Sequence, residues 1–242
     1  MIPKIIHYCW FGGKPMPELA LKCIESWKKF LPEYELRLWN EETFDINSVP
    51  YVREAYEARK FAFVTDYVRL WALEREGGVY MDTDVEVLRP FELLLNDVAF
   101  IGLEESLALL PGTCVMGCEA HCQWVRDMLC TYENASFIHE DATLDMTTNV
   151  QRLGKRMQEG GLLPERKIQY LPQWGLRVYT HDYFSPITST RVMRKTKNTF
   201  CIHHFAGSWT NQKYHRLRDS WLVREVINAL VQIKRKLKGY RS

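Results

Sequence analysis

The first 39 residues alternate between apolar strands and a helix, and this order restricts the fold more than any other feature. Residues 4–10 and 34–39 are apolar runs typical of buried strands. Between them, apolar residues recur at helical spacing from Leu19 to Leu31, with Pro17 suited to the first turn and Pro32 placed to end the helix. A strand–helix–strand order predicts an α/β fold with a parallel sheet.

The composition bounds the size and the partners of the protein. Its 242 residues suffice for one large domain, and 46% hydrophobic with 26% charged residues is ordinary for a soluble globular protein. A formal net charge of +2 gives no reason to expect nucleic acid as a partner. The first residues lack the features of a signal peptide and no apolar run reaches the length of a membrane span, so we expect a cytoplasmic protein.

Seven cysteines, an odd number, favour reduced thiols over a disulfide framework. Cys114, Cys118 and Cys122 recur at every fourth position, as they would along one face of a helix, with His121 and Cys130 nearby. This spacing leaves a zinc or iron–sulfur site open. Because zinc sites usually use more closely spaced pairs, we interpret the three cysteines as core residues.

A second helix leads into the strand that carries the strongest polar signal. We expect helix 65–76 to begin at Thr65 and to end at Gly77-Gly78, before a strand over 79–88. On that strand, one face would be apolar and the other polar: Val79, Met81, Thr83, Val85 and Val87 against Tyr80, Asp82, Asp84 and Glu86. Further strands are expected at 98–103, 168–171 and 200–203, and helices at 122–132 and 150–158.

Asp82 and Asp84 lie two residues apart, so their carboxylates would point the same way and converge on one hard cation, Mg²⁺ or Mn²⁺. Such a cation can hold the diphosphate of a nucleotide-sugar and neutralise the charge that grows on it as the glycosidic bond breaks. In isolation, a pair of this kind is more often a solvated strand edge.

Three motifs set this pair in context. They are Pro-Lys-Ile-Ile-His-Tyr-Cys-Trp at residues 3–10, Asp66 with Arg69 on the preceding helix, and Gly-Gly-Val-Tyr-Met-Asp-Thr-Asp at 77–84. Together they resemble glycosyltransferase family 32 and its relatives among the glucosylating bacterial toxins. The resemblance implies a GT-A-like single domain with a mostly parallel central sheet flanked by helices. It also implies a nucleotide-sugar donor, a divalent cation and retention of the donor's anomeric configuration.

The same resemblance assigns residue roles. Asp82 and Asp84 become catalytic and metal-binding, and Asp66 and Arg69, which share a helix face, contact the donor sugar. Trp10, at the end of the first strand, would stack on the base. The implied donor-binding set is His7, Trp10, Asp66, Arg69, Gly78, Tyr80, Asp82, Ser208 and Trp209. The alternatives are a surface ion pair for Asp66 and Arg69, core packing for Trp10, and packing beneath a loop for Tyr80.

The segment His203-His204-Phe205-Ala206-Gly207 resembles the closing His-aromatic-x-Gly motif of metal-dependent retaining transferases. By that match His204 is the third metal ligand, and His203 is its rival if the register shifts by one. A histidine beside two carboxylates suits Mn²⁺ better than Mg²⁺. The alternative is a histidine that caps a loop.

The rest of the chain carries weaker signals. Residues 104–191 should supply acceptor contacts, with Glu105, Asp145 and Asn149 as candidates, and no nucleophile is assigned, so we expect catalysis by positioning and electrostatics. After a catalytic domain over 1–215, residues 216–242 predict an amphipathic basic helix. That helix either packs on the domain or contacts an anionic membrane surface.

The expected function is transfer of a hexose, first of all from a UDP-sugar, to a glycan or lipid-linked glycan acceptor in bacterial surface polysaccharide synthesis. Three alternatives stay open. The acceptor could be a protein, as for the toxins. The chain could be a phosphohydrolase of the haloacid dehalogenase type, although Glu86 departs from that motif. It could also bind a nucleotide without catalysing a reaction.

Overall fold

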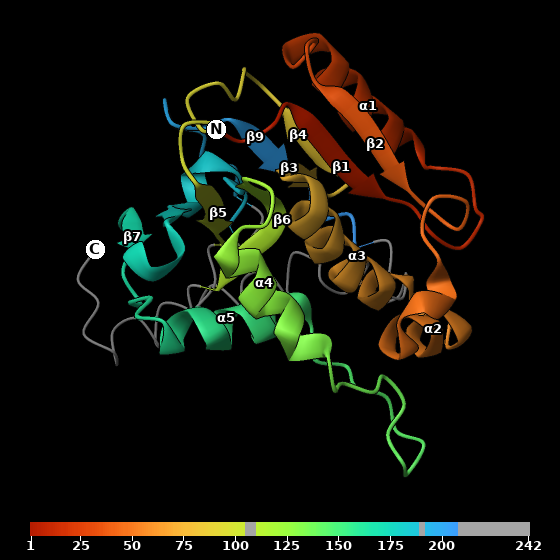
Figure 1. Ribbon diagram of the computed structural model, residues 1–242. Helices are drawn as coiled ribbons and strands as arrows, with labels where there is room; N and C mark the ends of the chain where they lie inside the picture. The colour runs from red at the N-terminus through yellow and green to blue at the C-terminus, as the bar shows by residue number, and fades with distance from the viewer. Residues whose placement is uncertain (105–109, 189–191, 208–242) are drawn as a thin grey trace.

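The computed structural model describes residues 1–104, 110–188 and 192–207, which build a central sheet of seven strands (Figure 1). In spatial order these strands are β2 (Glu35–Trp39), β1 (Ile5–Cys9), β3 (Gly78–Met81), β6 (Pro111–Cys118), β5 (Ala99–Leu103), β8 (Leu176–Tyr179) and β7 (Gln169–Leu171). Strands β6 and β7 run against the other five, which are parallel to one another. The expected α/β fold with a mostly parallel central sheet is confirmed.

The central sheet divides the hydrophobic core in two, and helices cover both of its faces. On one face, α1 (Glu18–Phe30) packs with a two-stranded antiparallel sheet of β4 (Val85–Val87) and β9 (Cys201–His203). The other face is covered by α2 (Pro50–Glu57), α3 (Phe61–Glu76), α4 (Gln123–Leu129) and α5 (Asn149–Glu159) (Figure 1). Short 3₁₀ helices lie at Ile46–Ser48, Cys130–Tyr132, Pro172–Trp174 and His181–Tyr183.

The predicted strand over 79–88 is two strands in different sheets. The backbone N–H of Asp82 donates to the Cys114 carbonyl at 2.9 Å, and the N–H of Val85 then donates back to the Asp82 carbonyl at 3.0 Å, which forms a turn. After that turn β4 pairs with β9 instead of continuing in the central sheet. The apolar face was predicted correctly, because the valines and Met81 all pack in the core on the α1 side. The two aspartates therefore lie at a turn between two sheets.

Helix α3, which precedes this turn, begins earlier than expected. It starts at Phe61 instead of Thr65, and Lys60 before it provides no side-chain cap. The first turn is held by burial of Phe63 and Val64, whose exposed fractions are 4% and 0%. The start of the helix is therefore set by tertiary packing, which leaves no capping pattern in the sequence. Its end was predicted correctly, because Gly77 caps α3 with φ at 65°.

The sequence pattern did not predict strand β6, and the secondary structure around the cysteines was therefore predicted wrongly. Cys114 and Cys118 belong to this strand, and Cys122 precedes α4, so the reading as one helix face was wrong. Every residue of β6 is buried, and a strand covered on both faces shows no apolar–polar alternation. The interpretation of the three cysteines as core residues is confirmed by their exposed fractions of 5% or less. Helix α2 and strand β8 were also not expected.

Several predictions concern residues that the structure leaves undescribed. These are the basic helix and the domain boundary near 215, together with Glu105, Ser208 and Trp209. Among the described residues, none of the helices reaches the length and hydrophobicity needed to cross a bilayer.

The connection from α3 to β3 depends on Gly77, which we expect to tolerate no side chain. A Cβ at this position would lie 2.5 Å from the Ala120 backbone nitrogen, whereas a Cβ at Gly13, with nearly the same φ, would meet nothing within 4 Å. Both positions have a positive φ, which costs an alanine about 1 kcal/mol or more, and Gly77→Ala adds a backbone clash of about 1–3 kcal/mol. At φ 65° and ψ −159°, the backbone of Gly77 also lies in a region that is essentially confined to glycine. Denaturant unfolding of both variants measures the difference. Equal losses of stability would contradict this account.

Candidate functional site

A buried arginine joins the helix α3 to the Asp82–Asp84 turn. The guanidinium of Arg69 lies 3.1 Å from Asp66 Oδ1 and 3.3 Å from Asp82 Oδ1. It also donates to the backbone carbonyl of Thr113 on β6 at 2.8 Å. Arg69 is 5% exposed and Asp66 is 8% exposed, so the surface ion pair considered above is excluded. The Arg69 guanidinium thus holds the carboxylates of Asp66 and Asp82, which lie on separate elements.

Tyr80 lies beneath this arginine and orients Asp82. The Arg69 guanidinium lies over the Tyr80 ring at 4.5 Å from its centroid, and the phenol hydroxyl donates to Asp82 Oδ1 at 2.8 Å. Only 1% of the Tyr80 surface is exposed, so the side chain offers little area for a sugar or ribose. In this position it orients Asp82, and its donor contact stays a prediction.

Asp66 is held on its other side by the first residue of α5. The backbone N–H of Asn149 donates to Asp66 Oδ2 at 2.9 Å, and its side-chain amide donates to the Asp66 carbonyl at 3.2 Å. Burial raises the pKa of Asp66 to about 6, although Arg69 and the Asn149 N–H act in the opposite direction. Asn149, expected among acceptor contacts, therefore supports a donor-side residue, while Asp145 pairs with Arg152.

Asp84 joins the turn to the segment after β9. Its Oδ2 accepts the backbone N–H of Ala206 at 2.7 Å, and its carbonyl accepts that of His204 at 3.0 Å. Its Oδ1 lies 3.4 Å from His203 Nε2. Burial alone would raise the pKa of Asp84, but His203 and the Ala206 N–H lower it below the ordinary value. The carboxylate is thus held in its ionised form.

The structure brings His203, and not His204, to the two aspartates. Ligand atoms of Asp82, Asp84 and His203 all lie within 4.8 Å of one another. His204 Nε2 lies 3.0 Å from Glu86 Oε2 instead. Because successive side chains of a strand point in opposite directions, the end of β9 can present only one of these histidines to the turn. Burial alone would lower the pKa of His203, but Cys114 and Asp84 raise it well above the ordinary value.

This ligand set fits a divalent cation. Two carboxylates and one imidazole supply oxygen and nitrogen ligands, which suit Mn²⁺ better than the all-oxygen preference of Mg²⁺. Both aspartates are only partly buried, so their outer sides face solvent, where a diphosphate can approach. The closing motif predicted His204 as the third ligand, with His203 as the alternative, and the pairing of Val85 with His203 places His203 at the turn instead.

Three other predicted donor residues have different surroundings. Trp10 follows β1 at the edge where β3 also ends, and it is partly exposed, so its ring remains available for stacking. His7 is fully buried, its Nε2 bonded to the Gly77 carbonyl at 2.8 Å and its Nδ1 to the Trp39 indole at 3.1 Å. Gly78 begins β3, at the end opposite Asp82. His7 and Gly78 thus lie away from the aspartate turn, and their donor contacts stay predictions.

The fold and this arrangement define an α/β protein with a buried Asp–Arg pair beside an Asp-x-Asp turn. Residues 17–101 match the sequence family described as a glycosyltransferase sugar-binding region containing the DXD motif. The match includes Asp66, Arg69, Asp82 and Asp84. This part of the chain is thus similar to the DXD-containing sugar-binding region of glycosyltransferases. The finer assignment to family 32 stays a prediction.

Two curated relatives share this region. Over 104 residues the chain is 32% identical to inositol phosphoceramide mannosyltransferase 3 of Schizosaccharomyces pombe, covering 41% of this chain and 29% of that protein. Over 105 residues it is 29% identical to mannosyl phosphorylinositol ceramide synthase CSH1 of Saccharomyces cerevisiae, covering 42% and 28%. The chain therefore spans less than a third of the length of either relative.

Among solved structures, the chain resembles a glycosyltransferase involved in the glycosylation of the major capsid of PBCV-1. The TM-score is 0.49 at 13% sequence identity, over 83% of this chain and 93% of that chain.

The burial of His7 generates a prediction about stability. Burial lowers the pKa of His7 to about 4, because the folded state holds the ring neutral. In the unfolded chain the His7 ring is protonated as the pH falls below about 6.5. The contribution of the neutral His7 ring to the free energy of unfolding is therefore complete above that pH and is lost as the pH falls towards 4. We expect a loss of about 3 kcal/mol of unfolding free energy from this residue over that interval. Denaturant unfolding at several pH values measures it.

The His7→Gln variant should be less stable at neutral pH and should lack this portion of the pH dependence. The His121→Gln variant, which removes an exposed imidazole, is the matched control. A pH profile of His7→Gln that runs parallel to that of the unchanged protein would refute the assignment.

Proposed function

We propose that this chain is a metal-dependent, retaining glycosyltransferase that moves a hexose from a nucleotide-sugar to a glycan or lipid-linked glycan acceptor. One observation carries the proposal: Arg69 holds Asp66 and Asp82 together in a site where Asp84 and His203 complete a cation ligand set. The resemblance noted in the sequence adds retention, a UDP-linked donor and bacterial surface polysaccharide synthesis in the cytoplasm.

In the proposed reaction Asp82, Asp84 and His203 would hold the divalent cation, Mn²⁺ before Mg²⁺. When bound, such a cation neutralises the charge that develops on the departing diphosphate. The chain's own contribution is preorganisation. Tyr80 and Arg69 fix the orientation of Asp82, and the Ala206 N–H fixes Asp84, so little reorganisation remains when the donor binds.

Asp66 and Trp10 would position the two ends of the donor. With a pKa of about 6, Asp66 is ionised at neutral pH and can accept hydrogen bonds from sugar hydroxyls. The partly exposed ring of Trp10 offers a face for the base at the same sheet edge. The proposal assigns no enzyme nucleophile, so rate acceleration comes from positioning and electrostatics.

The identity of the sugar stays open within this proposal. The names of both yeast relatives refer to mannosyl transfer to a phosphoinositol ceramide, which favours a hexose and a lipid-linked acceptor. A test panel therefore contains GDP-mannose beside the UDP-hexoses.

The decisive test is donor hydrolysis by the purified chain. We expect release of the nucleoside diphosphate from one member of the panel with Mn²⁺ and none with a chelator. Asp84→Asn should lower this rate by about 100-fold or more, because the variant loses a charged cation ligand. Asp45→Asn is the matched control, since asparagine caps the 3₁₀ turn at Ile46–Ser48 as well as aspartate does. Metal-independent turnover, or equal rates in both variants, would defeat the proposal.

The two histidines give a second test. We expect His203→Asn to weaken Mn²⁺ binding by about tenfold or more, and His204→Asn to change it little, because only His203 reaches the aspartates. Electron paramagnetic resonance of free Mn²⁺ measures both affinities without any donor. The reverse pattern would instead support the assignment of His204 by the closing motif.

Retention is tested by the product. Proton magnetic resonance of the first product formed gives the configuration of the new glycosidic bond. The same configuration as in the donor is expected, and inversion would remove that element of the proposal. Transfer to protein in a lysate, with no glycan product, would favour the toxin-like alternative.

A further inference from the structure

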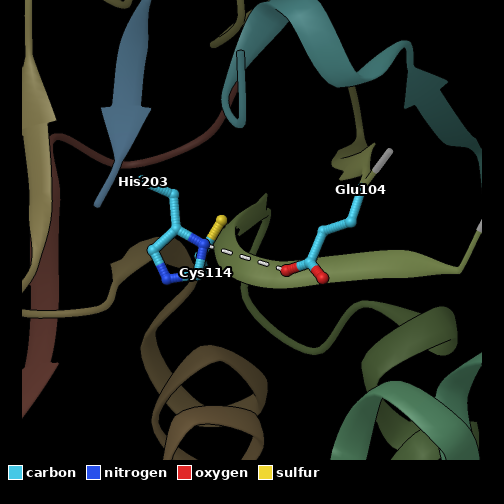
Figure 2. Close-up of side chains that lie close together, drawn as sticks. All are labelled: Glu104, Cys114 and His203. Atoms are coloured by element: carbon cyan, nitrogen blue, oxygen red, sulfur yellow. Dashed lines mark ion pairs between the residues drawn. The ribbon is translucent and has the colours of Figure 1, made fainter. Parts of the chain in front are cut away.

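His203 has a second group of possible metal ligands on its other side. Its Nδ1 faces Glu104, which follows β5, and Cys114 of β6, and Figure 2 shows the three side chains converging. The ligand atoms of Glu104, Cys114 and His203 all lie within 4.8 Å of one another. This group shares only His203 with the aspartates of the proposed donor site.

The inner nitrogen of His203 lacks a partner that would explain its burial. His203 is 8% exposed, and its Nδ1 makes no hydrogen bond to any described residue. Its ion pair with Glu104 Oε1 is long, at 3.8 Å, and is marked in Figure 2. Leaving a buried polar atom unsatisfied costs about 1–3 kcal/mol, so such an atom in a native site calls for an ion or another ligand.

The chemistry of the group differs from that of the aspartate site. A thiolate, an imidazole and a carboxylate are ligands that bind Zn²⁺ in proteins, and the soft thiolate favours Zn²⁺ over Mn²⁺ and Mg²⁺. Around a tetrahedral zinc ion, with bonds of about 2.0–2.3 Å, neighbouring ligand atoms lie roughly 3.3–3.8 Å apart. The 3.8 Å between the nitrogen and the carboxylate oxygen exceeds the spacing expected for these two ligands by about 0.5 Å, a difference that a small side-chain rotation closes.

The Cys114 side chain is suited to this role. It is 1% exposed, and its sulfur lies 3.4 Å from the hydroxyl of Ser185, a buried polar neighbour. Its own backbone carbonyl accepts the N–H of Asp82, so the thiol is attached directly to the strand that supports the aspartate turn. A cation bound here would lie next to the donor site without using either aspartate.

We propose that Glu104, Cys114 and His203 form a zinc site with three protein ligands, and that zinc bound there opposes binding of the cation at Asp82 and Asp84. Binding displaces the thiol proton and any proton on Nδ1 to solvent, and no bond to carbon changes. The antagonism rests on the proposed function; the zinc site itself does not.

Zinc and the cation at the aspartates exclude each other because both would bind through the His203 imidazole. A neutral imidazole has one nitrogen lone pair free for a metal, and the other nitrogen keeps its proton. Zinc at Nδ1 leaves the proton on Nε2, which then donates towards Asp84 Oδ1 at 3.4 Å and cannot bind a second cation. Occupying both nitrogens at once requires removal of both ring protons.

Metal binding at Glu104, Cys114 and His203 is tested with Co²⁺ and Zn²⁺ on the metal-free full chain. A Cys130→Ser background removes the exposed thiol. Co²⁺ should produce the thiolate-to-metal charge-transfer absorption, and Zn²⁺ should abolish it. Against a chromophoric chelator, Cys114→Ala should weaken zinc binding by about tenfold or more, and Glu104→Gln should weaken it as well. Cys118→Ala, a buried thiol of the same strand, should leave it unchanged.

No charge-transfer band in the Cys130→Ser protein, or equal zinc affinity in Cys114→Ala and Cys118→Ala, would overturn the site. Because the band is read on a protein with Cys114 intact, the test stands even if Cys114→Ala folds poorly. Neither outcome bears on the proposed function, which the Asp84→Asn comparison tests.

The antagonism is tested by Mn²⁺ binding with and without zinc. Zinc should raise the Mn²⁺ dissociation constant, and by reciprocity Mn²⁺ should raise that of zinc by the same factor. In Cys114→Ala, zinc at the same concentration should leave Mn²⁺ binding unchanged. Independent binding of the two metals to the Cys130→Ser protein would overturn the shared role of His203.

Discussion

The buried contact of Arg69 with Asp66 and Asp82 is the interaction on which the rest of the site depends. Three elements meet at this guanidinium: helix α3, the turn after β3, and β6 through the Thr113 carbonyl. Removing one partner from a buried pair typically costs about 3–5 kcal/mol, because the remaining charge stays buried without compensation. The aspartate turn therefore cannot shift independently of α3. Tyr80 and Asn149 extend the same network, one below Asp82 and the other beside Asp66.

A second constraint comes from the change of sheet at residues 82–84. Since β3 ends at Met81 and β4 begins at Val85, the chain leaves the central sheet between the two aspartates and pairs with β9. This pairing brings the last described strand, more than a hundred residues away in sequence, to the turn. His203, Asp84 and the Ala206 N–H then meet through strand register, without any loop having to close. The site is thus assembled from residues 66–84 and from the last described strand.

Local signals in the sequence predicted which residues cluster around Asp82, and long-range pairing determined the rest of the site. Asp66, Arg69, Asp82 and Asp84 lie within one helix–turn–strand unit, and the resemblance of this unit to a known family, not the spacing alone, indicated that they act together. Strand β6 was missed because its glycines, cysteines and proline, buried on both faces, resemble no strand pattern. The contacts of Glu104 and Cys114 with His203 depend on the register of β5, β6 and β9, and adjacent histidines cannot be distinguished without it. His7, predicted to bind the donor, is buried in the core, where its two partners lie on β2 and at the end of α3.

Charge balance explains why a site of this composition needs a divalent cation in the proposed function. Three carboxylates, Asp66, Asp82 and Asp84, face one guanidinium and one imidazole. Arg69 already neutralises parts of Asp66 and Asp82 and, at 5% exposure, has little surface left for a phosphate. A nucleoside diphosphate would therefore meet net negative charge at Asp84 and the outer side of Asp82. At short range in a partly desolvated site such repulsion is strong, whereas a cation held between the carboxylates and the diphosphate reverses its sign. Among the described residues, His203 belongs to both ligand sets: one ring nitrogen faces the aspartates and the other faces Glu104 and Cys114. In the proposed antagonism, zinc on the second nitrogen keeps the ring proton on the first and so prevents the cation from binding there.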